Sequence, residues 1–176
     1  MSFTVKLDST KHLEGIRKLF QEAKKEMKET LHEVGDLIID DAINIEPMPF
    51  LDTGFLQGSS FKQVSGKSAV VNPLGESIES SPDQKQLPIP SGDMEELHLR
   101  VGFLAEYAIY LHDNPDATPR KISTRKDVKG NPIIKKASMA GRGPYWLSSK
   151  VERFTNSVYI PFIQIRYNQR MSGKNL

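Results

Sequence analysis

The chain has 176 residues, of which 38% are hydrophobic, and this suits one domain with a modest core. It contains no cysteine, which excludes a disulfide framework, thiolate catalysis and cysteine metal sites. No apolar run approaches the roughly eighteen residues of a membrane helix, and Met1–Lys6 lacks signal-peptide character. We therefore expect a soluble intracellular protein with no membrane partner.

The net charge of +2 hides an uneven distribution. Residues 1–46 carry 7 basic and 10 acidic groups (−3), and residues 47–114 carry 4 and 9 (−5). Residues 115–143 carry 8 and 2 (+6), and residues 144–176 carry 5 and 1 (+4). Such polarity fits contact with a nucleic acid, and it fits equally well the head-to-tail packing of identical subunits.

A long amphipathic helix is predicted first, from Thr10 to Ile45. Apolar residues recur there in steps of three and four, at Leu13, Ile16, Phe20, Ala23, Met27, Leu31, Val34, Ile38, Ala42 and Ile45. Pro47 and Pro49 predict the end of this helix between Asn44 and Glu46, because the residue before a proline avoids helical geometry.

Asp52, Thr53 and Gly54 follow, and we interpret them as a structural turn. The Asp and Thr side chains accept backbone N–H bonds, and Gly54 tolerates positive φ. The same three letters occur in the catalytic loop of aspartic proteases, in which two carboxylates share a proton. That loop needs an apolar strand before Asp52 and a small residue after Gly54, whereas Pro47–Pro49 precedes here and Phe55 follows.

The middle of the chain predicts a small antiparallel sheet. Segments 60–64 and 68–71 form an expected hairpin, and 97–103 alternates as a half-buried strand. Residues 72–93 between them are rich in proline and glycine, and we expect a mobile insertion there. A short helix is expected over 105–112, with Ala105, Ala108, Ile109 and Leu111 able to face the core.

A second mobile insertion is expected over 113–143, and it is basic. Its cations are candidate contacts for DNA or for a neighbouring subunit: Arg120, Lys121, Arg125, Lys126, Lys129, Lys135, Lys136 and Arg142. The last helix is expected to begin at Pro144 and to run through Ile165, with a kink or break at Pro161.

His112 and Asp113 invite an acid–base or metal-site hypothesis, since a carboxylate often orients a catalytic imidazole. No second ligand lies nearby in the sequence, and the other histidines belong to unrelated patterns, so packing or hydrogen bonding is the favoured role. Tyr107, Tyr110, Tyr145 and Trp146 fit a core or a subunit interface better than base stacking. No Walker loop, dinucleotide fingerprint or nuclease carboxylate cluster occurs, and we expect neither an enzyme nor a cofactor or metal.

Five features follow one another over about residues 13–165: a long helix, Pro-x-x-Asp-Thr-Gly-x-Leu-x-x-Ser, Tyr-Ala-x-Tyr-x-His, a variable loop and an aromatic-Leu helix. The residues that carry this pattern are Pro49, Asp52, Thr53, Gly54, Leu56, Ser59, Tyr107, Ala108, Tyr110, His112, Trp146 and Leu147. In this order they resemble the minor tail or tail-completion proteins at the head-to-tail neck of tailed bacteriophages. The chain departs from the pattern at Asp113–Pro115, where a Gly-rich turn is usual, and in the long insertion over 72–93.

The order of the predicted elements indicates one α+β domain over 1–176, with the long N-terminal helix and a C-terminal helix packed on a small antiparallel sheet, and the resemblance implies the same fold class. It implies a structural virion protein, found in the host cytoplasm during assembly and then in the neck. Its partners would be its own copies, in a ring that is commonly six-fold, together with connector and tail-tube or tail-terminator proteins and the DNA that passes through. A tail terminator or minor capsid protein is the close alternative, and a DNA-binding module or an aspartic protease with Asp52 belongs to other classes.

Overall fold

The computed structural model describes residues 9–49, 55–75, 85–92, 94, 96–115 and 141–173, and its fold is α+β. The elements in chain order are α1 (Ser9–Asn44), α2 (Phe55–Gly58), β1 (Ser60–Val64), β2 (Val70–Val71), β3 (Leu99–Phe103), α3 (Ala108–Asp113), α4 (Ser148–Phe154), the π-helical turn η2 (Thr155–Tyr159) and α5 (Ile160–Ser172). The predicted fold class is thus confirmed. No helix in these ranges is both long and apolar enough to cross a bilayer.

The three strands form one antiparallel sheet in the order β2-β1-β3. Ser60 pairs with Phe103 and Val64 with Leu99, so the predicted hairpin and the predicted third strand meet along β1. Beyond the end of β3, the segment 85–92 runs alongside: Gln86 bridges Ala105, and the Leu87 N–H donates to the Leu104 carbonyl at 2.6 Å. Around Gln86 and Leu87, the 72–93 insertion therefore pairs with the chain that follows β3.

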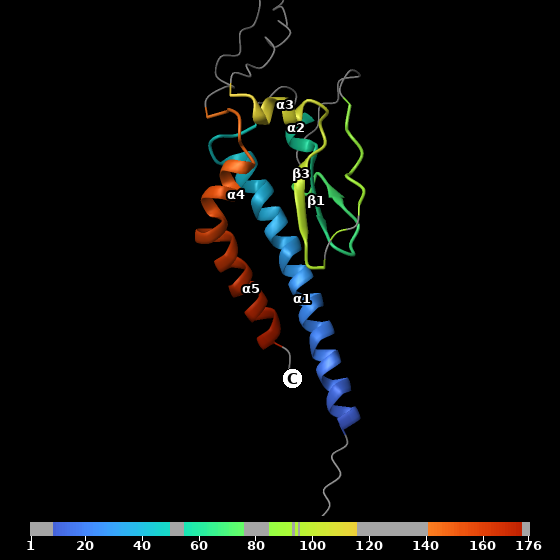
Figure 1. The fold of residues 1–176 in the computed structure, drawn as a ribbon. Coiled ribbons are helices and arrows are strands. Elements are labelled where there is room, and N and C mark those ends of the chain that lie inside the picture. The colour runs from blue at the N-terminus through green and yellow to red at the C-terminus, as the bar shows by residue number, and fades with distance from the viewer. Residues whose placement is uncertain are drawn as a thin grey trace, which may run out of the picture.

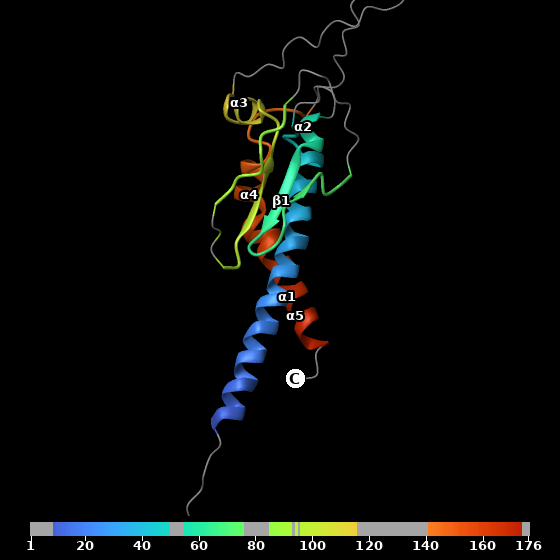
Figure 2. The same ribbon diagram turned by 90° about the vertical axis from the view of Figure 1, so that its right-hand side faces the viewer.

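Helix α1 is the central element on which the sheet and the C-terminal helices pack (Figure 1). The sheet lies on one side of it, and α4, η2 and α5 run back antiparallel along another side, as Figure 2 also shows. Two contacts fix that direction: the Tyr159 hydroxyl donates to Asp41, and the Arg170 guanidinium pairs with Glu26. The C-terminal helices thus reach the sheet chiefly by packing on α1.

Two apolar clusters fill the space between these layers. The first lies at the end of the molecule that carries α2 and α3, and its buried members are Ala42, Phe55, Leu56, Ala105, Ala108 and Trp146. The second joins α1 to the C-terminal helices and β3 through Val34, Ile38 and Tyr159, with Leu99, Val101, Phe154 and Phe162 packed around them. Full burial of a large apolar side chain contributes about 1.5–3 kcal/mol, so both clusters stabilise the packing of these layers.

The C-terminal helix begins later than predicted. It begins at Ser148 and not at Pro144, because Tyr145 has a φ of +59° that no right-handed helix accommodates. The regular α-helix is interrupted just before Pro161, where a kink or break was predicted: the five-residue π-helical turn separates α4 from α5, and Ile160 N–H donates to Thr155 O. Pro161 thus lies in the first turn of α5, where its missing donor costs little.

Candidate assembly interface

Residues of the sequence motifs meet in the first apolar cluster and lock α2, α3 and the start of α4 together. Ser59 is fully buried; its Oγ donates to the Leu56 carbonyl at 2.7 Å and accepts the Ala105 N–H at 3.1 Å. The Leu104 N–H donates to the Ser59 carbonyl at 2.8 Å. Trp146 packs in the same cluster and meets the Phe103 ring edge-on at 6.1 Å between centroids. We call this packed group, which includes Leu56, Ser59, Phe103 and Trp146, the platform.

His112 is part of that platform. Its Nε2 accepts the Ser148 N–H at 3.2 Å, so the ring proton lies on Nδ1, which donates to Asp113 Oδ1 at 2.5 Å. The ring stands edge-on to Trp146, with centroids 4.9 Å apart. Both ring nitrogens are therefore engaged in holding α3 against the start of α4. This is the packing and hydrogen-bonding role that we favoured over acid–base chemistry.

The outer side of α3 presents apolar and aromatic side chains to solvent. Ile109 is 71% exposed and Tyr110 is 62% exposed, and Tyr145 is also exposed. The prediction that Ile109 faces the core is wrong. Ala108 and Leu111, three residues apart, lie on the covered side of this six-residue helix, which turns Ile109 and Tyr110 outward. We call Ile109, Tyr110 and Tyr145 the α3 patch.

Arg142 is the one predicted basic-loop residue among those described, and it closes the stem of that loop. Met48 N–H donates to the Gly141 carbonyl at 2.8 Å, and Gly143 N–H donates to the Met48 carbonyl at 3.0 Å. The Arg142 guanidinium donates to the Pro49 carbonyl at 2.6 Å, and burial lowers the pKa of Arg142. Arg142 is therefore engaged with the protein's own backbone.

The other predicted site residues lie outside the described residues. These are the turn Asp52, Thr53 and Gly54, and the basic-loop residues Arg120, Lys121, Arg125, Lys126, Lys129, Lys135 and Lys136. Described residues on either side of the basic segment meet, since the Tyr145 N–H donates to the His112 carbonyl at 2.8 Å. Between them in the sequence, residues 116–140 carry 7 basic and 2 acidic groups.

Sequence reasoning missed a group of buried ionic side chains behind this platform. Lys150 is fully buried, donates from Nζ to the Pro47 carbonyl at 2.9 Å, and has a pKa that burial lowers. Near it, the Tyr159 hydroxyl donates to Asp41 Oδ2 at 3.0 Å. Burial raises the pKa of Asp41 and that of Tyr159, so Tyr159 stays a neutral donor. These two hydrogen bonds join the C-terminal helices to Pro47, in the chain before α2, and to Asp41 of α1.

A second buried cation lies under the sheet. Lys62, only 3% exposed, pairs from Nζ with Asp36 Oδ1 at 2.5 Å and contacts His32 Nδ1 at 2.8 Å and the His32 carbonyl at 3.1 Å. The burial of Lys62 could have been predicted from the sequence. Side chains alternate between the two faces of a strand, so Lys62 lies on the same face of β1 as buried Val64. Burial and the Lys62 charge lower the pKa of His32, which fits an imidazole that accepts from an ammonium.

No group of three or more acidic or histidine side chains within the described ranges is arranged to hold a metal ion. Comparison with known proteins adds no identification: no family model, no curated protein and no solved structure matches the chain.

Proposed function

We propose that the protein is a non-catalytic structural subunit of a tailed-bacteriophage virion, a tail-completion or neck component that forms a ring at the head-to-tail junction. The observation that carries the proposal is the α3 patch: Ile109 and Tyr110 stand exposed on a platform built from the same motif residues on which the resemblance rests. Exposed apolar side chains on a rigid, ordered base are typical of subunit contacts.

The platform supports an assembly role because two of its polar side chains, Ser59 and His112, are occupied in holding it together. The His112 nitrogens and the Ser59 hydroxyl each bond to protein groups. The α3 patch offers apolar and aromatic surface to a partner, and the sequence of residues 116–140 adds a net charge of +5. A neighbouring subunit that offers an acidic, partly apolar face suits both features, and residues 47–114 of the same chain have a net charge of −5.

Exposed apolar side chains also occur on the C-terminal helices, at Val151, Val158, Ile160 and Ile165. A subunit with two different apolar contact faces favours head-to-tail association. Such association forms a ring when the rotation from each subunit to the next adds up to a full circle. A tail terminator or minor capsid protein would use the same surfaces, and the position in the virion decides between these roles.

The test is the mass of the purified protein by light scattering, with and without assembled phage tail tubes. We expect a ring, or a monomer that joins tube ends, and we expect the double change I109S/Y110S to abolish that association. Glu152→Gln, a change of an exposed charge on α4, is the matched control and should associate normally. A monomer that ignores tubes refutes the proposal.

The DNA-binding alternative is favoured by one observation, the 7 cations within residues 116–140. Neutralising Arg125, Lys126 and Lys129 together separates the two functions. Salt-sensitive duplex binding that disappears in this variant supports DNA contact. Association lost without any DNA binding in the parent protein supports the subunit interface. Peptide cleavage by the parent protein that Asp52→Asn removes would favour the protease instead.

A further inference from the structure

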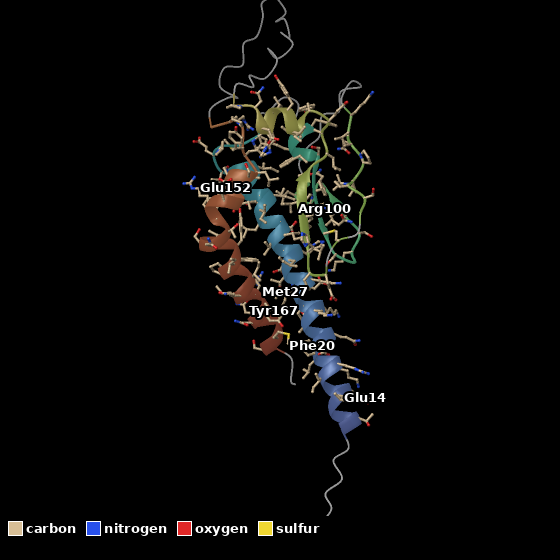
Figure 3. The ribbon with its side chains drawn as sticks, in the orientation of Figure 1. Glu14, Phe20, Met27, Arg100, Glu152 and Tyr167 are labelled. Carbon is tan, nitrogen blue, oxygen red and sulfur yellow. The ribbon has the colours of Figure 1, made fainter. Side chains whose placement is uncertain are left out.

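Helix α1 extends well beyond the rest of the molecule at its N-terminal end. Figure 1 shows the sheet and α5 covering its upper part, while the first turns project alone. Two ion pairs lie near the point where the sheet side and α5 stop packing on α1. Lys24 pairs with Glu96 of the sheet side at 2.9 Å, and Arg170 of α5 pairs with Glu26 at 3.3 Å. In Figure 3, Glu14 lies on the projecting part, Phe20 lies level with the last turn of α5, and Met27 lies where α5 runs beside α1.

The apolar stripe of α1 continues along this projection. Above Met27 the stripe carries Val34 and Ile38, which pack against Tyr159 in the second cluster. Below Met27 the same line, in steps of three and four, continues as Ala23, Phe20, Ile16 and Leu13. Phe20 is 65% exposed, Leu13 and Ile16 are each about half exposed, and Leu19 beside them is 40% exposed. We call these four large side chains the α1 tip.

The two flanks of the α1 tip differ in charge. Arg17 and Lys24, seven residues apart, lie on one line of the helix, and the contact of Lys24 with Glu96 places that line on the sheet side. On the same side, a shallow hollow of about 310 Å³ is lined by four lysines (Lys24, Lys25, Lys28 and Lys67), with Gln21, Glu29 and Glu96. Lys24 and Lys67 pair with Glu96 and Glu29, and Lys25 and Lys28 leave a net positive charge there. The opposite flank carries Leu19, then exposed Glu22 three residues further along the helix, and then Glu26, which pairs with Arg170. One flank is therefore basic, and the other combines an apolar side chain with acidic ones.

We infer that the α1 tip docks an amphipathic helix of another protein, one whose apolar stripe is bordered by carboxylates that face Arg17 and Lys24. Apolar side chains at helical spacing are the surface into which another helix packs, and the basic flank selects an acidic border. This inference does not depend on the virion proposal, since it follows from the uncovered stripe and its charges alone.

A second copy of this chain fits the α1 tip less well. Two tips packed antiparallel would set Arg17 and Lys24 of one copy against the same cations of the other, and like charges there oppose pairing. Two tips packed parallel would bring both bodies to the same end. There, the space beside Val34 and Ile38 is already filled by Tyr159 of the same chain.

Fluorescence anisotropy with two synthetic helical peptides tests the inference on the full-length protein. Both peptides carry the same Leu and Ile stripe; one has glutamates on its flanks and the other has lysines at the same positions. We expect the glutamate peptide alone to bind, with an affinity that falls as salt rises. Phe20→Ser should weaken this binding by about tenfold or more, and so should the double change R17Q/K24Q. Leu87→Ser, which removes an exposed apolar side chain from the segment 85–92, should bind as the parent does.

Three results would overturn the inference. The lysine peptide binding as tightly as the glutamate peptide removes the charge argument, and unchanged binding by the Phe20 variant removes the docking surface. A concentration-dependent doubling of mass that Phe20→Ser abolishes would identify a second copy as the occupant. Far-ultraviolet circular dichroism is the control for folding. The spectrum of each variant should match that of the parent, because the substituted side chains are exposed.

Discussion

Replacing Asp36 by asparagine tests how the buried Lys62 ammonium is stabilised. Lys62 is 3% exposed and has three acceptors within reach: Asp36 Oδ1 at 2.5 Å, His32 Nδ1 at 2.8 Å and the His32 carbonyl at 3.1 Å. Only the first carries a charge when His32 is neutral. Asp36→Asn keeps the shape and an acceptor oxygen and removes the negative charge, so it isolates the charge-pairing component of the free energy of unfolding.

The expected magnitude follows from the exposure of the two partners. Breaking a fully buried ion pair costs about 3–5 kcal/mol, because it leaves an uncompensated buried charge. Here Asp36 is 41% exposed, so water weakens the pair, and both His32 acceptors remain. We therefore expect Asp36→Asn to lower the free energy of unfolding by about 1–2 kcal/mol.

The reverse change should cost less. Lys62→Met keeps the methylene packing against Gly35, removes the buried charge and leaves Asp36 exposed enough to be hydrated. Its effect should stay within about 1 kcal/mol of zero. The double variant should then match Lys62→Met, since Asp36 has no cation left to pair.

Urea unfolding followed by circular dichroism measures these differences as shifts in the midpoint at constant m value. Asp40→Asn, a change of an exposed aspartate on the same helix, is the control and should stay within about 0.5 kcal/mol of the parent. The reasoning fails if Asp36→Asn is neutral while Lys62→Met costs more than about 3 kcal/mol, because Lys62 would then act through packing alone.

Three further predictions concern groups described above. The pKa of His32 is lowered in the fold by burial and by Lys62, so its contribution to stability is full above its unfolded pKa of about 6.5 and is lost as the pH falls through the lowered folded value. Urea midpoints between neutral and mildly acidic pH should therefore drop more for the parent than for His32→Asn, which keeps an acceptor but does not titrate; parallel curves would contradict this. Tyr159→Phe removes the donor to buried Asp41 and should cost about 1–3 kcal/mol near neutral pH. Because burial raises the pKa of Asp41, protonation of that carboxyl at low pH should shrink this cost, and a loss that does not change with pH would argue against it. Gly141→Ala should destabilise the loop stem, since Gly141 has a φ of +70° and an added Cβ would collide with the Glu46 carboxyl; Gly15→Ala, at an open helical site, should stabilise slightly in the same thermal melts.

The periodic parts of the fold were predictable from the sequence. Residues spaced three and four apart predicted α1 to within a residue at each end, and alternation predicted the hairpin and β3. These patterns work because burial on one side of a helix or strand dictates the residue type position by position. The fold class followed from the order of those elements.

The end of the molecule that carries α3 was less predictable, because tertiary contacts decide its local geometry. Tyr145 adopts positive φ while its N–H donates to His112 and Trp146 enters the core, so the helix expected from Pro144 starts late. Ile109 was assigned to the core from its apolar character, yet a short helix at the end of a molecule has only one covered side. Long-range partners such as Asp36 for Lys62 have no local signature either.

The π-helical turn Thr155–Tyr159 sets the angular phase of everything that follows it. Its wider turn accommodates one residue more than an α-helix would, and α5 inherits that offset while Arg166 and Arg170 reach Glu33 and Glu26. Deleting a single residue there would restore an ordinary helix and rotate α5 by about 100° about its own axis. Both arginines would then point away from α1, and a different set of side chains would face outward. One residue of chain length thus determines which side of the C-terminal helix is exposed to solvent.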